Sequence, residues 1–108
     1  MSDRKPGTVS QILINGRKYL GDEDNWCQHK SRIATGMWLR RHERFCATGY
    51  IAHKASSRDL AKQAMEFLSN ASCECYGRSP IYVNDNHGHE AVLRVYDKAI
   101  FMALSKGV

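Results

Sequence analysis

The spacing of apolar residues predicts helices along most of the chain. The clearest case is residues 87–105, where apolar side chains recur at steps of three and four. Glu90 and Arg94 lie four apart on the opposite side of this helix, where they form a favourable pair. Asn84 or Asp85 is expected to cap its start. The predicted apolar stripe consists of Val92, Val95, Tyr96, Ala99, Ile100, Ala103 and Leu104.

Two signals compete near the beginning of the chain. The dipeptide Asn15-Gly16 is typical of a tight hairpin turn between two strands. The same stretch has apolar residues at helical spacing, and Thr8 with Gln11 has the pattern of a capping box. Because two signals favour a helix and one favours a hairpin, we predict a helix over residues 8–20.

The middle of the chain alternates between irregular and helical patterns. Residues 21–36 show no sustained period and are predicted to be a long connection anchored by a buried Trp26, with a short extended piece near Arg32–Ala34. A helix is expected from Phe45 until Ser56, and Ser56 is expected to cap the next helix.

The Ser56-capped helix, with Asp59 in its capping box, is predicted to end at residues 69–70. Residues 72–80 are expected to be a loop because they contain Gly, Ser and Pro, and residues 81–83 a short extended stub. The prediction is therefore an all-α single domain of about four helices with a long Trp-anchored loop. Residues 1–7 are expected to be a flexible N-terminus, 8–105 the domain, and 106–108 a C-terminal tail.

Composition narrows the class of protein. The chain has 108 residues and a formal net charge of +5, and all of the positive excess precedes residue 56. No apolar run approaches the ~20 residues of a membrane span, and the basic start lacks the apolar stretch of a signal peptide. We therefore expect a cytoplasmic location with no membrane contact and with the four cysteines as thiols.

Three short motifs resemble those of a family of small uncharacterised bacterial and phage proteins. Members of that family carry W-x-Q-G, then C-A-x-G-A-L, then I-x-x-W-N-D before a last helix. The matching residues here are Trp26-Cys27-Gln28, Cys46-Ala47-Thr48-Gly49, and Ile81 with Asn84-Asp85. The chain departs from the pattern at His29 (Gly expected), Tyr50 (Ala expected) and Val83 (Trp expected). The resemblance implies a mainly helical single domain and no assigned activity.

Cysteine and histidine pairs raise the question of a metal site. Zinc is usually held by pairs separated by two to four residues, whereas the pairs in this chain are separated by one. Thiols in a loop and exposed imidazoles explain these pairs better than a zinc site does, and no metal or other cofactor is predicted. The pairs are Cys73 with Cys75, His87 with His89, and Cys27 with His29.

Cys46 is the candidate nucleophile. It is expected near the start of a helix, where the helix dipole favours a thiolate. A histidine (His42 or His87) with Asn84 or Asp85 would complete a catalytic set in space. The alternative is a small buried residue where helices approach one another. Because no hydrolase motif surrounds Cys46, we predict no catalytic residue and no enzyme.

Basic and aromatic residues instead favour binding. A basic face next to exposed aromatic side chains is typical of protein interfaces and also of nucleic-acid contacts. Phe101 leaves the apolar stripe of the C-terminal helix and is expected to face water. The predicted partner-binding residues are Lys30, Arg32, Trp38, Arg40, Arg41, Arg44 and Phe101.

The resulting prediction is a small non-enzymatic binding protein of phage or mobile-element type. It would inhibit or modulate a host macromolecular machine, as anti-defence or anti-CRISPR proteins do, by engaging a host protein or ribonucleoprotein complex with an acidic surface. A nucleic-acid-binding protein is the alternative, and a Cys- or zinc-dependent enzyme comes third. The sequence also leaves open whether the chain pairs with a second copy of itself as a homodimer.

Overall fold

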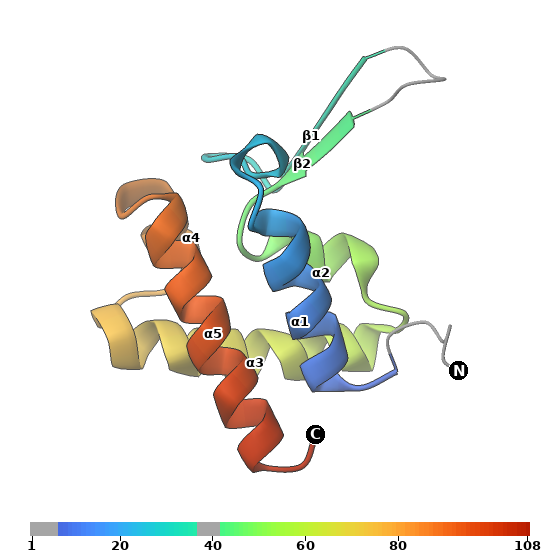
Figure 1. Cartoon of the computed structure of the whole chain (residues 1–108), viewed down its shortest axis with the longest axis vertical. Coiled ribbons are helices and arrows are strands. Elements are labelled where there is room, and N and C mark those ends of the chain that lie inside the picture. The colour runs from blue at the N-terminus through green and yellow to red at the C-terminus, as the bar shows by residue number, and fades with distance from the viewer. Residues whose placement is uncertain (1–6, 37–41) are drawn as a thin grey trace.

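Three long helices form the centre of the molecule. The structure, a computed structural model, describes residues 7–36 and 42–108. Within them α1 (Val9–Leu20), α3 (Arg58–Tyr76) and α5 (His89–Ser105) pack against one another (Figure 1), and the side chains between them make up most of the buried core. None of the described helices is long and apolar enough to cross a membrane.

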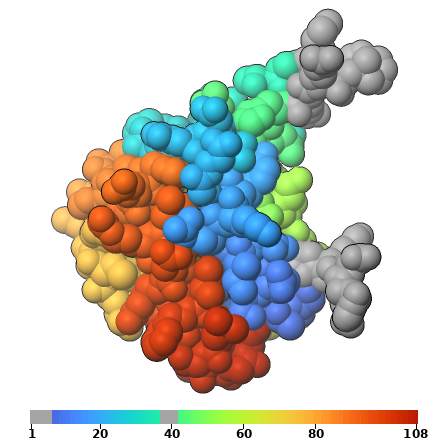
Figure 2. Space-filling view, in the orientation of Figure 1, coloured from blue at the N-terminus to red at the C-terminus, as the bar shows by residue number. Residues whose placement is uncertain are grey.

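Shorter elements surround this centre. The helices α2 (Gly49–Lys54) and α4 (Pro80–Asn86) and the 3-10 turn η1 (Glu23–Asn25) complete the helical body. The strands β1 (Arg32–Thr35) and β2 (His42–Phe45) pair antiparallel, and this hairpin extends from one end of the body (Figures 1 and 2). The described fold is therefore mostly helical, and the all-α prediction is corrected by one small sheet.

The helix predicted at the start of the chain is confirmed. Thr8 caps α1 by accepting a hydrogen bond from the Gln11 backbone amide at 3.2 Å. Gly16 does not make a hairpin turn but faces the core, where an added Cβ would lie 2.9 Å from the ring of Tyr96. The absence of a side chain at Gly16 thus leaves room for the fully buried ring of Tyr96. This packing explains why a glycine lies inside helix α1.

The predicted C-terminal helix is confirmed, but α3 is longer than expected. The N-cap of α3 is Ser57 rather than Ser56. The helix does not end at residues 69–70 but continues to Tyr76, because Ala71 and Ser72 extend its buried face. It ends at Gly77, whose φ of 68° is the left-handed conformation that glycine adopts without strain. The expected loop over residues 72–80 is therefore only the connection 77–79.

The stub predicted over residues 81–83 is also wrong, because these residues belong to α4. Ser79 caps this helix and Pro80 occupies its first turn, an arrangement that favours a helix start. Asn84 and Asp85 consequently lie inside α4 and do not cap α5, whose N-cap is Gly88.

The predicted helix from Phe45 is wrong in its first part. Phe45 ends β2, pairing with Arg32 of β1 on one side and forming a parallel bridge with Trp26 on the other. The side chain of Phe45 is fully buried. Helical structure begins only at Gly49, after a turn. The extended piece expected near Arg32–Ala34 is confirmed as β1.

A substitution at Gly49 tests the close approach between the start of α2 and the loop before β1. A Cβ at this position would lie 1.9 Å from the Ser31 carbonyl oxygen, which already accepts a hydrogen bond from the Cys46 amide. We expect Gly49→Ala to lower the free energy of unfolding by about 3 kcal/mol, because backbone must move. Urea denaturation measures this cost.

Gly77→Ala is the matched control. Its Cβ would meet nothing within 4 Å, so only the left-handed backbone is strained and a cost of about 1 kcal/mol is expected. If Gly49→Ala costs no more than Gly77→Ala, the close contact with Ser31 is refuted.

Candidate functional site

One buried side-chain amide, that of Asn84, connects three separate segments. Its Oδ1 accepts hydrogen bonds from the Trp26 indole (2.7 Å) and from the Ala47 backbone amide (2.8 Å). Its Nδ2 donates to the Cys27 carbonyl at 3.0 Å and to Asp85 Oδ1 at 3.1 Å. Asn84 is fully buried, so these bonds are made away from water, where leaving any one unmade is costly.

The neighbouring Asp85 holds the loop that follows Trp26. Its Oδ1 accepts from the His29 backbone amide at 2.8 Å, and its Oδ2 lies 3.6 Å from His29 Nδ1. Gln28 donates from its side chain to the Asn84 and Asp85 carbonyls. His29 has a φ of 68°, which is the backbone conformation that glycine adopts most easily.

The motif residues therefore meet at one place, and most of them have structural roles. Ala47 additionally accepts a 2.5 Å hydrogen bond from the buried Tyr96 hydroxyl. Among the described residues, no buried side-chain nitrogen or oxygen lacks a partner. The polar groups that connect the motifs are thus used in holding the fold. The sequence alone predicts Asn84 and Asp85 as a helix cap or as candidate catalytic partners, and it does not predict these hydrogen bonds between segments.

The residues around the cysteines do not form the candidate catalytic set that the sequence analysis weighed and did not predict. Cys46 is buried, and its Sγ accepts a hydrogen bond from the Gly49 amide at 3.3 Å. His42 bonds to the Asp24 carbonyl instead of a thiol, and His87 packs on Tyr76. Cys27 is buried as well, and burial raises the pKa of its thiol, which disfavours the reactive thiolate.

The cysteine and histidine pairs do not come together as a metal site in the described residues. Cys73 and Cys75 lie two apart on helix α3, so about 200° of helical rotation separates their side chains. His89 Nε2 is hydrogen-bonded to the Leu20 carbonyl. No group of three or more His, Cys, Asp or Glu that could hold a metal ion is found in residues 7–36 and 42–108.

The predicted basic residues divide between the two faces of the hairpin. In the pairing register Ile33 lies opposite Arg44, so both side chains point to one face. Arg32 points to the other face, where its Nε lies 2.9 Å from Glu43 Oε2. Arg44 and Lys30 are exposed and form no ion pair with a described residue. Trp38, Arg40 and Arg41 lie outside the described residues.

Phe101 does not belong to the same surface. It is 64% exposed, as its departure from the apolar stripe predicts. It lies near the end of α5, however, and that end of the helix is on the far side of the body from the hairpin (Figure 1). The predicted partner-binding residues that the structure describes therefore do not form one continuous face.

A depression of about 520 Å³ lies where the hairpin joins the body. The Ile33 and Arg44 face of the hairpin forms one wall. The Trp26–His29 loop and η1 form the others, and η1 contributes two exposed carboxylates. We call this the hairpin-base surface. Its lining residues are Glu23, Asp24, Trp26, Cys27, Gln28, His29, Ile33 and Arg44.

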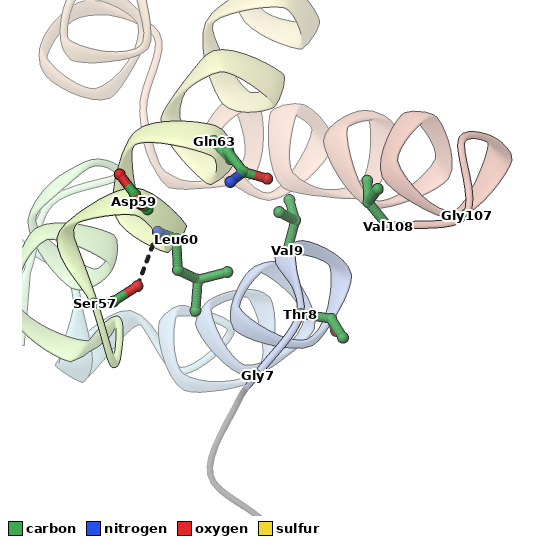
Figure 3. A pocket seen from close by; sticks show the side chains of 9 residues that line it. All are labelled: Gly7, Thr8, Val9, Ser57, Asp59, Leu60, Gln63, Gly107 and Val108. Atoms are coloured by element: carbon green, nitrogen blue, oxygen red, sulfur yellow. Dashed lines mark hydrogen bonds between the residues drawn. The ribbon is translucent and has the colours of Figure 1, made fainter.

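A second hollow, of about 380 Å³, lies among the starts of α1 and α3 and the end of the chain (Figure 3). The hydroxyls there already cap helices: Ser57 Oγ accepts from the Leu60 amide, and Thr8 caps α1. Apolar side chains of Val9, Leu60 and Val108 fill part of its wall. Nothing in this hollow indicates a particular ligand, so the hairpin-base surface is the stronger candidate.

Comparison with known proteins identifies a family whose function is unknown. The model of a family of unknown function, DUF6197, matches residues 4–101, so the chain belongs to that family. Neither a curated protein nor a solved structure matches the chain.

Asn84→Ala tests whether the buried amide holds the three segments together. The substitution leaves the Trp26 indole and the Ala47 amide without their acceptor, so we expect the free energy of unfolding to fall by about 3 kcal/mol. Asn70→Ala, at an exposed position of α3, should change it by less than about 0.5 kcal/mol. Equal effects in urea denaturation would disprove the structural role.

Asp85 predicts a pH dependence of stability. Partial burial acts to raise the pKa of Asp85, but hydrogen bonds from the His29 amide and the Asn84 side chain outweigh it, so the pKa lies below its ordinary value of 3.8. A carboxyl whose pKa is lowered by folding stabilises the protein above the unfolded pKa. This contribution is lost as the pH falls through the folded pKa.

Asp85→Asn should therefore flatten the decrease in stability below pH 3.8. Asp97→Asn is the control, because Asp97 is exposed and, within residues 7–36 and 42–108, forms an ion pair with Arg17 alone. Unfolding free energies measured across this acid range should separate the two variants. The same acid slope in Asp85→Asn and wild type would contradict the role of Asp85.

Proposed function

We propose that this member of the family is a non-enzymatic binding protein that engages a protein partner through the hairpin-base surface. The observation that carries the proposal is the arrangement of charge in the depression. Arg44 lines one wall and Glu23 and Asp24 line another, yet none of the three forms an ion pair with a described residue. Opposite charges that face the same space unpaired are available to a partner that carries both signs.

The support of this surface also favours binding. The Asn84 amide and the Asp85 carboxylate of α4 hold the Trp26–His29 loop in place through the hydrogen bonds described above. A fixed loop loses little conformational entropy when a partner binds. The Trp26 side chain adds a half-buried aromatic group, and aromatic side chains with arginine are enriched in protein interfaces.

A nucleic acid is the second candidate, and a specific observation favours it. A two-stranded antiparallel ribbon has the dimensions that the major groove of DNA admits, and the sequence between β1 and β2 contains Arg40 and Arg41. Glu23 and Asp24 act against this candidate, because a polyanion lying on the Arg44 face would meet their carboxylates. For this reason we place a protein partner first.

The finer proposal concerns the biological setting. Small size and the resemblance to bacterial and phage proteins support an inhibitor or modulator of a host macromolecular machine, acting in the bacterial cytoplasm. In that setting the partner is a host protein or ribonucleoprotein complex. Its acidic groups would meet Arg44 and Lys30, and its basic groups would meet Glu23 and Asp24.

Charge reversal on the hairpin tests this proposal. We expect the tagged wild-type protein to recover a protein partner from bacterial lysate after nuclease treatment, and Arg44→Glu to reduce recovery about tenfold, the effect of ~1.4 kcal/mol. Arg58→Glu is the control, because Arg58 is exposed on α3 outside this surface. Both variants should keep wild-type unfolding curves.

Two outcomes would overturn the proposal. Recovery that nuclease abolishes, together with direct binding of a labelled DNA duplex that weakens steeply with salt, would establish the nucleic-acid alternative. Equal recovery by Arg44→Glu and wild type would show that the partner uses another surface.

A further inference from the structure

A second surface lies at the corner between α3 and α4, away from the hairpin-base surface. Its backbone is fixed from inside the protein. Gly77 ends α3 in the left-handed conformation, Ser79 caps α4, and the fully buried Ser72 hydroxyl donates a 2.5 Å hydrogen bond to the Arg78 carbonyl. The position of Arg78 is thus set by the core, although its side chain is exposed.

Rings and guanidinium groups from three helices and the corner form a continuous series on this surface. The Arg78 guanidinium lies over the Tyr82 ring, 4.6 Å from its centroid. The Tyr82 and His87 centroids are 5.9 Å apart, and His87 stacks on Tyr76 at 5.0 Å. Arg94 of α5 donates to the Tyr76 hydroxyl at 3.2 Å. We call this series the corner array.

The corner array holds its two arginines ready for a ligand. Stacking on Tyr82 restricts the Arg78 side chain, and the hydrogen bond to Tyr76 restricts Arg94, so less entropy is lost when either binds an oxyanion. Arg78 forms no ion pair with a described residue. Among the residues that the structure describes, the one carboxylate near Arg94 is that of the exposed Glu90 at 3.9 Å, a contact worth little in water.

Apolar surface adjoins these charges. Ile81 is 56% exposed and Tyr82 is 40% exposed, and both belong to the outer side of α4. Tyrosine, arginine and an exposed aliphatic side chain are the composition of an interface core. The positive charge of two arginines is sparse for a nucleic-acid site, which follows a backbone of many phosphates.

We propose that the corner array is a docking site for an acidic segment of a protein partner. Carboxylates of that segment would pair with Arg78 and Arg94, whose forked geometry suits carboxylate oxygens. An apolar side chain between those carboxylates would cover Tyr82, which lies between the two arginines in the series, and could extend onto its exposed neighbour Ile81. This site is independent of the hairpin-base surface and needs none of its residues.

Selection from a displayed library of random peptides tests the proposal. We expect the wild-type protein to enrich peptides in which Asp or Glu flank an apolar residue. A selected peptide, labelled with fluorescein, should bind in fluorescence polarisation about tenfold more weakly to Arg78→Ala and to Tyr82→Ala. Tyr82→Phe keeps the ring and should retain the affinity.

Three further variants serve as controls. Arg58→Ala removes an exposed arginine elsewhere on α3, Phe101→Ala removes an exposed aromatic ring of α5, and Arg44→Glu changes the hairpin. All three should bind the peptide within about twofold of wild type. Because Arg44→Glu is among them, failure of the hairpin proposal is distinguishable from failure of this one.

Three results would overturn the docking site. The first is the absence of acidic peptides among those enriched, and the second is equal binding of the selected peptide by Arg78→Ala and wild type. The third is binding of a labelled single-stranded oligonucleotide that Arg78→Ala and Tyr82→Ala both weaken, because that would assign the array to nucleic acid.

Discussion

The arrangement of this fold depends on the hydrogen bonds of a single buried amide. Asn84 accepts two hydrogen bonds and donates two. A side-chain amide has two N–H donors and two acceptor lone pairs, so its full hydrogen-bonding capacity is used. The groups that it satisfies belong to the loop after η1, to the turn after β2, and to α4 itself. No other side chain has the same donors and acceptors at the same length, since glutamine is longer by one methylene and aspartate lacks the donors. This amide joins the segments on either side of the hairpin to α4, and the Tyr19 hydroxyl of α1, which donates to the Glu43 carbonyl of β2, attaches the hairpin itself to the body.

Sequence periodicity predicts the parts of the fold in which whole helical turns face the core. It identifies α1 and α5 because their apolar stripes run unbroken and Thr8 caps the first of them. It fails at α4, where residues 81–83 are predicted to be extended, although Ser79 followed by Pro80 is a helix-start signal. The hairpin is harder to predict from the sequence than α4. Phe45 belongs to a strand because it pairs with both Arg32 and Trp26, and such pairing is not visible in local sequence.

The candidate site is predictable in its residue types but not in its arrangement. Counting charges locates the basic excess, yet only the register of β1 and β2 places Arg44 on one face and Arg32, paired with Glu43, on the other. Glu23 and Asp24 change the interpretation of the surface from basic to mixed, and they are brought there by η1. The corner array is beyond sequence reasoning altogether, because His87 reaches Tyr76 only when residues 80–86 are helical.

The short helix α4 links the two surfaces physically. Its inner residues, Asn84 and Asp85, hold the loop that lines the hairpin-base surface, while its outer residues, Ile81 and Tyr82, form part of the corner array. A helix of two turns has little stability of its own, so its position comes from Ser79, Pro80 and the buried Val83 and Asn84. Any force that moves α4 must therefore break the Asn84 hydrogen bonds and disturb both surfaces together. Occupancy of one surface is coupled to the other only to the extent that a partner shifts this helix. Because Asn84 is fully buried and all four of its hydrogen bonds are made, such a shift is energetically costly, and the two surfaces should bind their partners independently.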